Sequence, residues 1–243
     1  MIKGIFTSAS AMVPRVRKQE MLANNIANAG STGFKKDRMF TKELSKAVEK
    51  RIPRKTDWEK PMVDKVYVDL APGVFDKTGN PLDLAIEGDG FFTLQAPDGR
   101  TVLTRSGTFQ VDANGLLSFP GGFNLLGDGG PIQVGNGDLS VGSDGELEVD
   151  GLAVDRVVPR SIADTDNLIR LGGSLFAVPE GEELLPAISA TIRQGYLETS
   201  NVDVVREMVE MIISYRSFEA NAKALQSQDQ SLSHLFNRVA GDR

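Results

Sequence analysis

Cysteine is absent from the 243-residue sequence, and histidine occurs once, at His234. Without cysteine there is no disulfide framework, no cysteine-ligated zinc, no iron–sulfur cluster and no thiol nucleophile. A multi-histidine metal site or a Ser-His-Asp triad would depend on His234 alone. The sequence also lacks any run approaching the roughly 18 apolar residues that a membrane-spanning helix needs. We therefore expect no enzyme activity, no catalytic residues, no cofactor, no metal site and no membrane insertion.

The first eleven residues, MIKGIFTSASA, carry only fragments of a secretory signal peptide. Lys3 supplies a positive charge, and residues 8–11 are small, but the apolar stretch is too short and too polar for such a signal. We expect a helix here and no cleaved signal peptide.

The net charge of −6 conceals an uneven distribution along the chain. Residues 1–60 carry 14 Lys or Arg against 6 Asp or Glu, whereas residues 61–200 carry 8 against 21. The same middle segment holds 21 of the 25 glycines. Because glycine favours turns and weakens helices, the middle is expected to be a turn-rich β body between helical ends.

Apolar residues recur at both ends with the alternating three- and four-residue spacing of a coiled-coil seam. We expect an N-terminal helix from about residue 2 to 28, kinked or broken at Pro14. A second helix is expected over 201–239, with Ser200 or Asn201 as its N-cap. The residues predicted to form an assembly interface are Ile2, Ile5, Ala9, Met12, Val16, Ala23, Ile26, Val204, Met208, Met211, Tyr215, Phe218, Leu225, Leu232 and Phe236.

The length of the C-terminal helix bears on what covers its seam. A helix over 201–239 would be about 58 Å long, whereas a body of about 140 residues has a radius of gyration of about 14 Å. The seam therefore needs a partner helix, first the N-terminal one and then helices of neighbouring subunits. Ordinary packing of two helices within one chain is the alternative.

Between residues 61 and 198 short strand candidates alternate with turn sequences. Val66, Val68 and Leu70 alternate with polar residues, and residues 101–105 (TVLTR) form another candidate. Turns are indicated at 97–99, 112–115, 143–145 and 150–151, where glycine supplies a positive φ. Their spacing is typical of a sandwich or distorted barrel built from hairpins.

These patterns give the fold class α+β. Long N- and C-terminal helices form a coiled-coil-like unit, and a Gly-rich all-β body lies between them. The expected divisions are an N-terminal assembly helix (1–30), a basic extended connector (31–60), a β-rich body domain (61–198) and a C-terminal assembly helix (199–243).

The glycines of the sequence Gly88-Asp89-Gly90 have two interpretations. The strand–GxGxxG–helix context of a dinucleotide site is absent, so the sequence indicates a turn. The turn presents Phe91 and Phe92, one of which must point to each face of a strand.

Acidic residues of the body raise two other possibilities. A carboxylate-dependent hydrolase would use Asp83, Glu87 or Asp89 as an acid/base pair, but nothing places them at a nucleophile or a substrate groove. The alternating acids of residues 144–150 lack EF-hand spacing, so a solvated strand face is the simpler interpretation than calcium binding.

The lysines and arginines of residues 35–60 are of a kind found in nucleic-acid-binding segments. The acidic body and the lack of a base-stacking aromatic cluster argue against nucleic acid. We expect the basic segment to dock on the acidic body of a neighbouring subunit, which predicts assembly that weakens as salt rises.

Several stretches of the sequence resemble those of the bacterial flagellar rod, hook and hook-filament axial family. Residues 23–35 read ANNIANAGSTGFK, similar to the family's N-terminal motif, and residues 197–221 resemble its C-terminal signature. Residues 78–92 and 104–115 are similar to the body domain of the rod proteins. The residues taken from the N-terminal motif are Asn24, Asn25, Asn28, Gly33 and Phe34.

The resemblance implies a structural subunit of the flagellar basal-body rod. Such a subunit polymerises through its terminal helices into a tubular, torque-transmitting drive shaft. The length of the chain points to the two rod members closest in size, the proximal-rod and distal-rod proteins. The sequence LLGDGGPI at 125–132 favours the proximal-rod type, whereas residues 78–92 are equally similar to the distal-rod protein. The alternatives are a distal-rod or other rod/hook axial subunit, or a coiled-coil scaffold unrelated to motility.

The implied partners are copies of the chain itself, neighbouring rod and hook subunits, the type III export apparatus and the surrounding ring proteins. The implied location is the rod where it crosses the periplasm, reached without a cleaved signal peptide.

Overall fold

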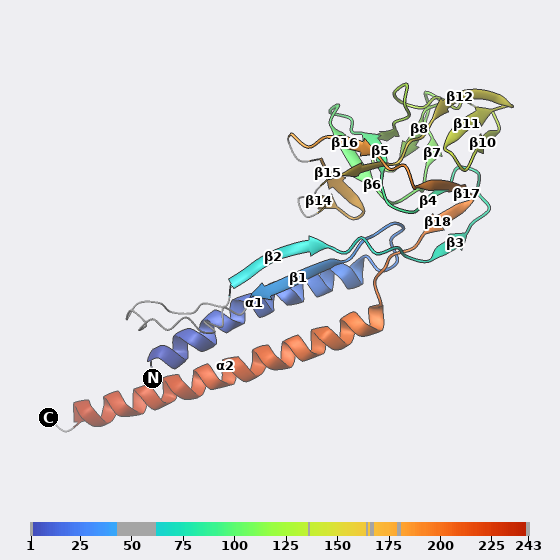
Figure 1. Ribbon diagram of the computed structural model, residues 1–243. Helices are drawn as coiled ribbons and strands as arrows, with labels where there is room; N and C mark the ends of the chain where they lie inside the picture. Colours follow the sequence, from blue (N-terminus) through green and yellow to red (C-terminus); the bar gives the residue numbers. More distant parts are fainter. Residues whose placement is uncertain are drawn as a thin grey trace. The chain divides into compact units, whose positions relative to one another are not determined.

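The computed structural model describes residues 2–42, 62–135, 137–163, 165, 168–178 and 181–241. The chain forms two compact units, and Figure 1 labels most of their helices and strands. The helical unit comprises residues 1–27, 37–67 and 203–243, and the body unit comprises residues 28–36 and 68–202. Residues 43–61, which include most of the predicted basic connector, lie outside the described residues.

Two helices and a β-ribbon make up the helical unit. Helix α1 spans Ile2–Ala27 and α2 spans Val204–Gly241. Strand β1, Asp37–Lys42, pairs with β2, Met62–Val68. Neither helix has, among its described residues, an apolar stretch long enough to cross a bilayer.

The ends and interior of the helices differ in detail from the sequence prediction. α1 continues through Pro14 without a break. The N-cap of α2 is Asp203, whose Oδ1 accepts a hydrogen bond from Arg206 N at 3.1 Å. The predicted caps have other partners: Ser200 Oγ accepts from Val202 N, and Asn201 binds Lys36.

The prediction of long N- and C-terminal helices forming a coiled-coil-like unit is wrong. The described chain has one shorter N-terminal helix of 26 residues and one C-terminal helix of 38, and the predicted apolar seam is buried only in part. Met208 and Tyr215 of that seam are 48% and 60% exposed, whereas the polar Glu207 and Ser214 are buried.

Polar side chains join α1 to α2. Lys18 Nζ lies 2.7 Å from Glu210 Oε2, and Ser214 Oγ donates to Arg15 O at 3.5 Å. The hydrogen bond from Lys18 lowers the pKa of Glu210. The physical reason for the error is that α2 carries apolar residues on more than one face, so periodicity alone does not select the face that meets α1.

The body unit consists of short antiparallel strands, in keeping with the predicted β-rich body. Its largest sheet has seven strands in the order β14-β15-β6-β5-β9-β8-β7, a second has the order β10-β11-β12, and the remaining pairs are β13-β16, β17-β4 and β18-β3. The strands are β3 (Phe75–Lys77), β4 (Leu84–Glu87), β5 (Phe92–Gln95), β6 (Thr101–Thr104), β7 (Gln110–Val111), β8 (Leu117–Phe119), β9 (Phe123–Leu125), β10 (Leu139–Val141), β11 (Glu146–Val149), β12 (Leu152–Arg156), β13 (Arg160–Ile162), β14 (Ile169–Gly172), β15 (Leu175–Ala177), β16 (Leu184–Pro186), β17 (Thr191–Gln194) and β18 (Tyr196–Glu198).

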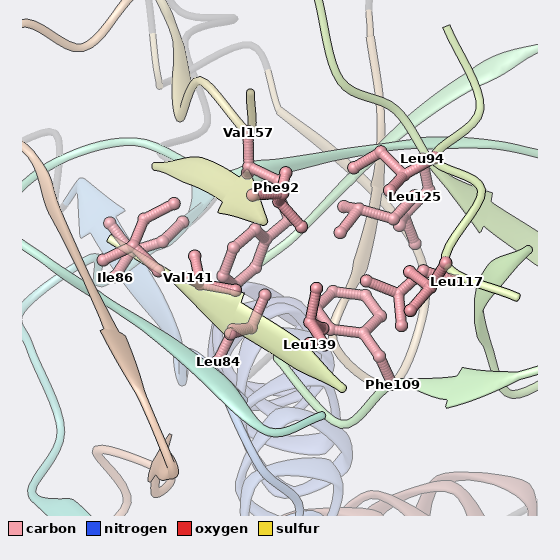
Figure 2. Packing of buried hydrophobic residues seen from close by; sticks show 14 of the residues in the cluster. Leu84, Ile86, Phe92, Leu94, Phe109, Leu117, Leu125, Leu139, Val141 and Val157 are labelled. Atoms are coloured by element: carbon pink, nitrogen blue, oxygen red, sulfur yellow. The ribbon is translucent and has the colours of Figure 1, made fainter. Parts of the chain in front are cut away.

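Two hydrophobic clusters lie on opposite sides of β5. The larger contains Phe92, whose ring meets that of Phe109 edge to face with centroids 5.3 Å apart (Figure 2). The smaller contains Phe91 and Phe176, whose ring centroids are 5.8 Å apart. Phe91 and Phe92 thus point to opposite faces, as predicted.

Candidate functional site

Residues 28–36 form tight turns that pack beside β18 within the body unit. Ser31 N donates to Asn28 O at 3.0 Å, and Gly33 N donates to Glu198 O at 2.7 Å. Gly33 has a φ of 62°, and a Cβ at this position would lie 2.3 Å from backbone atoms of Arg105 and Ser106. Glycine is therefore required both by its backbone conformation and by the close approach of the neighbouring chain.

Three charged side chains, those of Lys35, Arg105 and Glu198, meet beside this turn. We call them the charged junction. Lys35 Nζ lies 2.5 Å from Glu198 Oε1, and neither side chain has any exposed surface. Arg105 Nε lies 3.2 Å from Glu198 Oε2. Two buried cations thus share one buried carboxylate.

The cations of the charged junction also donate hydrogen bonds to backbone oxygens. Lys35 Nζ donates to Ala71 O at 2.9 Å. Arg105 donates to Gly88 O at 2.6 Å and to Gly90 O at 2.7 Å, which fixes the turn before β5. Buried polar groups that are satisfied in this way specify one arrangement of the surrounding chain.

Burial shifts the pKa of both cations. It lowers the pKa of Lys35, and the nearby carboxylate of Glu198 opposes this effect. Burial likewise lowers the pKa of Arg105, again opposed by Glu198. The single carboxylate is therefore the main compensation for two desolvated positive charges.

An aromatic side chain anchors the N-terminal turn beside the charged junction. Phe34 is fully buried. The Arg170 guanidinium lies 4.5 Å from the centre of the Phe34 ring and 4.8 Å from that of Phe176, a cation–π arrangement. Arg170 also donates to the backbone oxygen of Lys35. Phe34 was predicted as a motif residue, whereas Arg170 was not.

The motif asparagines lie in different surroundings. Asn25 is fully buried in the helical unit, where its Nδ2 donates to Asp37 O at 3.0 Å and to Glu207 Oε2 at 3.2 Å. Its Oδ1 accepts from Asp37 N at 3.0 Å. Asn25 therefore joins α1 to β1 and to α2. Asn24 is exposed, and Asn28 is half-buried at the start of the turn.

The predicted interface residues do not form one buried set. Val16, Ala23, Met208 and Tyr215 are exposed. The half-buried members are Met12, Ile26, Val204, Met211, Phe218 and Leu225. The side chains of Ile2, Ile5, Ala9, Leu232 and Phe236 lie outside the described residues.

Sequence reasoning missed part of an exposed apolar surface on the helices. We call the set of exposed residues on α2 the outer apolar face. Its members are Val205, Met208, Val209, Ile212, Ile213 and Tyr215. The signal was present as consecutive apolar pairs at 204–205, 208–209 and 212–213, which put apolar side chains on a second face of the helix.

Two of the carboxylates considered for catalysis, Asp83 and Glu87, have structural partners. Asp83 is buried and accepts a hydrogen bond from Asn80 Nδ2 at 3.1 Å. Glu87 pairs with Arg193 at 2.6 Å across β4 and β17. Within the part of the chain that the structure describes, no group of three or more His, Cys, Asp or Glu residues is arranged to hold a metal ion.

Replacement of Gly33 by alanine should destabilise the body unit by about 2 kcal/mol or more. The left-handed backbone alone costs about 1–2 kcal/mol for a residue with a Cβ, and the contact with the backbone of Arg105 adds to it. Gly79→Ala is the matched control, because Gly79 has a φ of 72° and open space around it. Urea unfolding of the full chain measures both, and equal losses would contradict the proposed close approach.

Three family models match successive parts of the chain. Residues 5–35 match the model described as flagella basal body rod protein, and residues 85–149 match the flagellar hook protein FlgE/F/G D1 domain. Residues 193–238 match the flagellar basal body rod FlgEFG protein C-terminal model. Each matched region contributes one member of the charged junction: Lys35, Arg105 and Glu198 respectively.

Curated relatives match the chain along almost its whole length. A flagellar basal-body rod protein FlgF of Mesorhizobium japonicum is 33% identical over 244 residues, covering 98% of each chain. The flagellar hook-basal body complex protein FlhO of Bacillus subtilis is 32% identical over 268 residues, covering 98% of this chain and 99% of the relative. A FlgG rod protein of Bacillus subtilis is 29% identical over 262 residues with the same coverage. The chain therefore belongs to the flagellar basal-body rod protein family.

Proposed function

We propose that the chain is a structural subunit of the flagellar basal-body rod, which polymerises with neighbouring subunits through the exposed surface of its terminal helices. The observation that carries this proposal is the outer apolar face of α2. Val205 is 73% exposed and Ile213 is 53% exposed, although both are large apolar residues. Contiguous apolar surface of this kind is typical of interaction sites.

The contact between α1 and α2 explains why this face is available. Their shared surface includes Glu207, Glu210 and Ser214, so the polar side of α2 is already used within the chain. Each large apolar side chain of the outer face would contribute about 1.5–3 kcal/mol if a neighbouring subunit buried it completely. The proposed occupant is a helix of another copy of this chain or of a related rod or hook subunit.

Within the rod we assign the chain to the proximal type. Its alignment with the FlgF relative spans 244 residues, close to the 243 of this chain, whereas the FlgG alignment spans 262. This agreement in length groups the chain with the FlgF relative rather than with the longer FlgG relative. A distal-rod or other rod/hook axial subunit is the alternative.

The remaining partners follow from the proposed place in the basal body. The chain would pass through the flagellar export apparatus without a cleaved signal peptide and would lie inside the surrounding ring proteins. Its role in the rod is to transmit torque, and it requires no catalytic group.

The helix-face variant V209K/I213K should lower incorporation into basal bodies by at least tenfold. Two lysines at these exposed positions would have to be desolvated in the proposed interface, which is strongly unfavourable. The measurement is the amount of the chain in basal bodies isolated from cells that carry only the variant, together with swimming motility.

V209L/I213L is the matched control, because it keeps the face apolar at the same two positions. It should assemble nearly as well as the wild type. Circular dichroism of the purified chains checks that the lysine variant keeps its helices. If a folded V209K/I213K variant enters basal bodies at the wild-type level, the outer apolar face is not the assembly surface.

A further inference from the structure

The charged junction connects two terminal segments of the body unit, residues 32–36 and residues 198–201. Besides the contact of Lys35 with Glu198, Gly33 N donates to Glu198 O at 2.7 Å. Lys36 N donates to Asn201 Oδ1 at 2.8 Å. The N-terminal segment therefore uses the C-terminal segment as its main source of hydrogen-bond acceptors.

The C-terminal segment has separate attachments to the rest of the body unit. Gly73 N donates to Glu198 Oε1 at 2.8 Å, and Thr199 N donates to Val74 O at 2.8 Å. Asn201 Nδ2 donates to Asp69 O at 2.8 Å. These bonds do not involve residues 32–36. Residues 32–36 also have attachments of their own, since Lys35 Nζ donates to Ala71 O and Asp69 N donates to Lys36 O at 2.8 Å. Hydrogen bonds alone therefore set no order between the two segments.

The charges of the junction make the two segments depend on each other unequally. Glu198 placed beside Arg105 forms a neutral pair in the absence of Lys35. Lys35 placed beside Arg105 in the absence of Glu198 leaves two buried cations without their main counter-ion, which is strongly unfavourable. The acids Asp69 and Asp89 face Lys35 and Arg105 respectively, but each is the weakest of the attractive influences on its cation.

We infer that the charged junction is an interlock that fixes the order in which the two terminal segments dock, with residues 198–201 binding beside Arg105 before residues 32–36 are added. The N-terminal segment then closes over a preformed carboxylate and supplies Phe34 to the core. Coupling of this kind acts between two sites through a shared group.

The interlock has a consequence for an incomplete chain. Residues 28–36 follow α1 directly, and residue 198 lies six residues before α2. Without its C-terminal segment, the chain would leave the segment after α1 undocked. For a subunit that is exported and then assembled, a step that rests on the proposed function, this delays closure of the body unit until the whole chain is present.

Hydrogen exchange on the purified full-length chain tests the interlock. Glu198→Gln keeps the shape and the acceptor for Gly73 N but removes the negative charge. It should raise exchange at least tenfold in residues 31–36, which lie more than 160 positions away in the sequence, as well as in residues 196–201. Lys35→Met, which leaves the neutral pair of Arg105 and Glu198, should change exchange in residues 196–201 by less than about threefold.

The double variant K35M/E198Q separates charge from packing. Without Lys35 no second cation is stranded, so Glu198→Gln should have a much smaller effect on residues 31–36 in this background. Glu87→Gln, which removes one partner of an exposed ion pair, is the control and should leave both segments unchanged.

Two outcomes would overturn the inference. One is increased exchange in residues 196–201 of the E198Q variant with residues 31–36 at the wild-type rate. The other is an equal effect of Glu198→Gln with and without Lys35. Because the measurement uses the isolated chain, it is independent of whether the chain assembles into a rod.

Discussion

Replacement of Phe92 by alanine should lower the free energy of unfolding of the body unit by about 3–5 kcal/mol. The Phe92 side chain is fully buried at the centre of the larger cluster (Figure 2). Its strand, β5, is paired on both sides, with β6 and with β9. Neighbouring strands therefore cannot collapse easily into the space that the ring leaves, and the cost includes both lost burial and a cavity.

Urea unfolding of the full chain, followed by circular dichroism, measures the effect. Phe92→Leu keeps most of the volume and should cost about 1.5 kcal/mol or less. Phe123→Ala is a second control, because Phe123 is only partly buried at the edge of the same cluster. A loss below about 1 kcal/mol for Phe92→Ala would contradict the central place of this ring.

Much of the body unit could be predicted from the sequence, because its turns and strands are specified by neighbouring residues. The turn at 112–115 illustrates this: Asp112 Oδ1 accepts from Asn114 N and from Leu116 N, and Gly115 has a φ of 78°. Side chains that alternate along a strand then fix the two faces of β5. The pairing of β15 with β6 connects residues about 70 positions apart, and no local pattern specifies it.

For the helices, the periodicity of apolar residues did not predict which face of α2 meets α1. A heptad pattern identifies an apolar face, but it does not say which partner covers that face. In α2 the side that meets α1 carries Glu207, Glu210 and Ser214, whereas the apolar side is exposed. A subunit of an assembly makes contacts within its own chain and contacts with its neighbours. Apolar periodicity reflects both kinds of contact and does not distinguish them.

The charged junction was missed for a different reason. Lysine, arginine and glutamate are ordinarily exposed, so sequence analysis gave them no place in the core. The available signal was positional, because Lys35 ends the N-terminal motif and Glu198 lies in the C-terminal signature. These positions alone do not pair the two residues, and only the fold brings Arg105 to the same carboxylate.

Replacement of Glu198 by alanine should cost about 3–5 kcal/mol of unfolding free energy, because it leaves two buried cations without their carboxylate. The same substitution removes the acceptor for Gly73 N. Glu87→Ala is the control: it removes one partner of the ion pair with Arg193, in which both side chains are nearly half exposed, and should cost about 0–1 kcal/mol. Urea unfolding of the full chain measures both variants.

The double variant K35M/E198L distinguishes the cost of stranded charge from the cost of lost packing. It removes one cation together with the carboxylate and fills their place with apolar groups, and such replacements of buried ion pairs are often close to neutral. Arg105 keeps its hydrogen bonds to Gly88 O and Gly90 O, but it still lacks its counter-ion, so recovery should be partial. A double variant as unstable as Glu198→Ala would show that the stranded charge of Lys35 does not determine the loss.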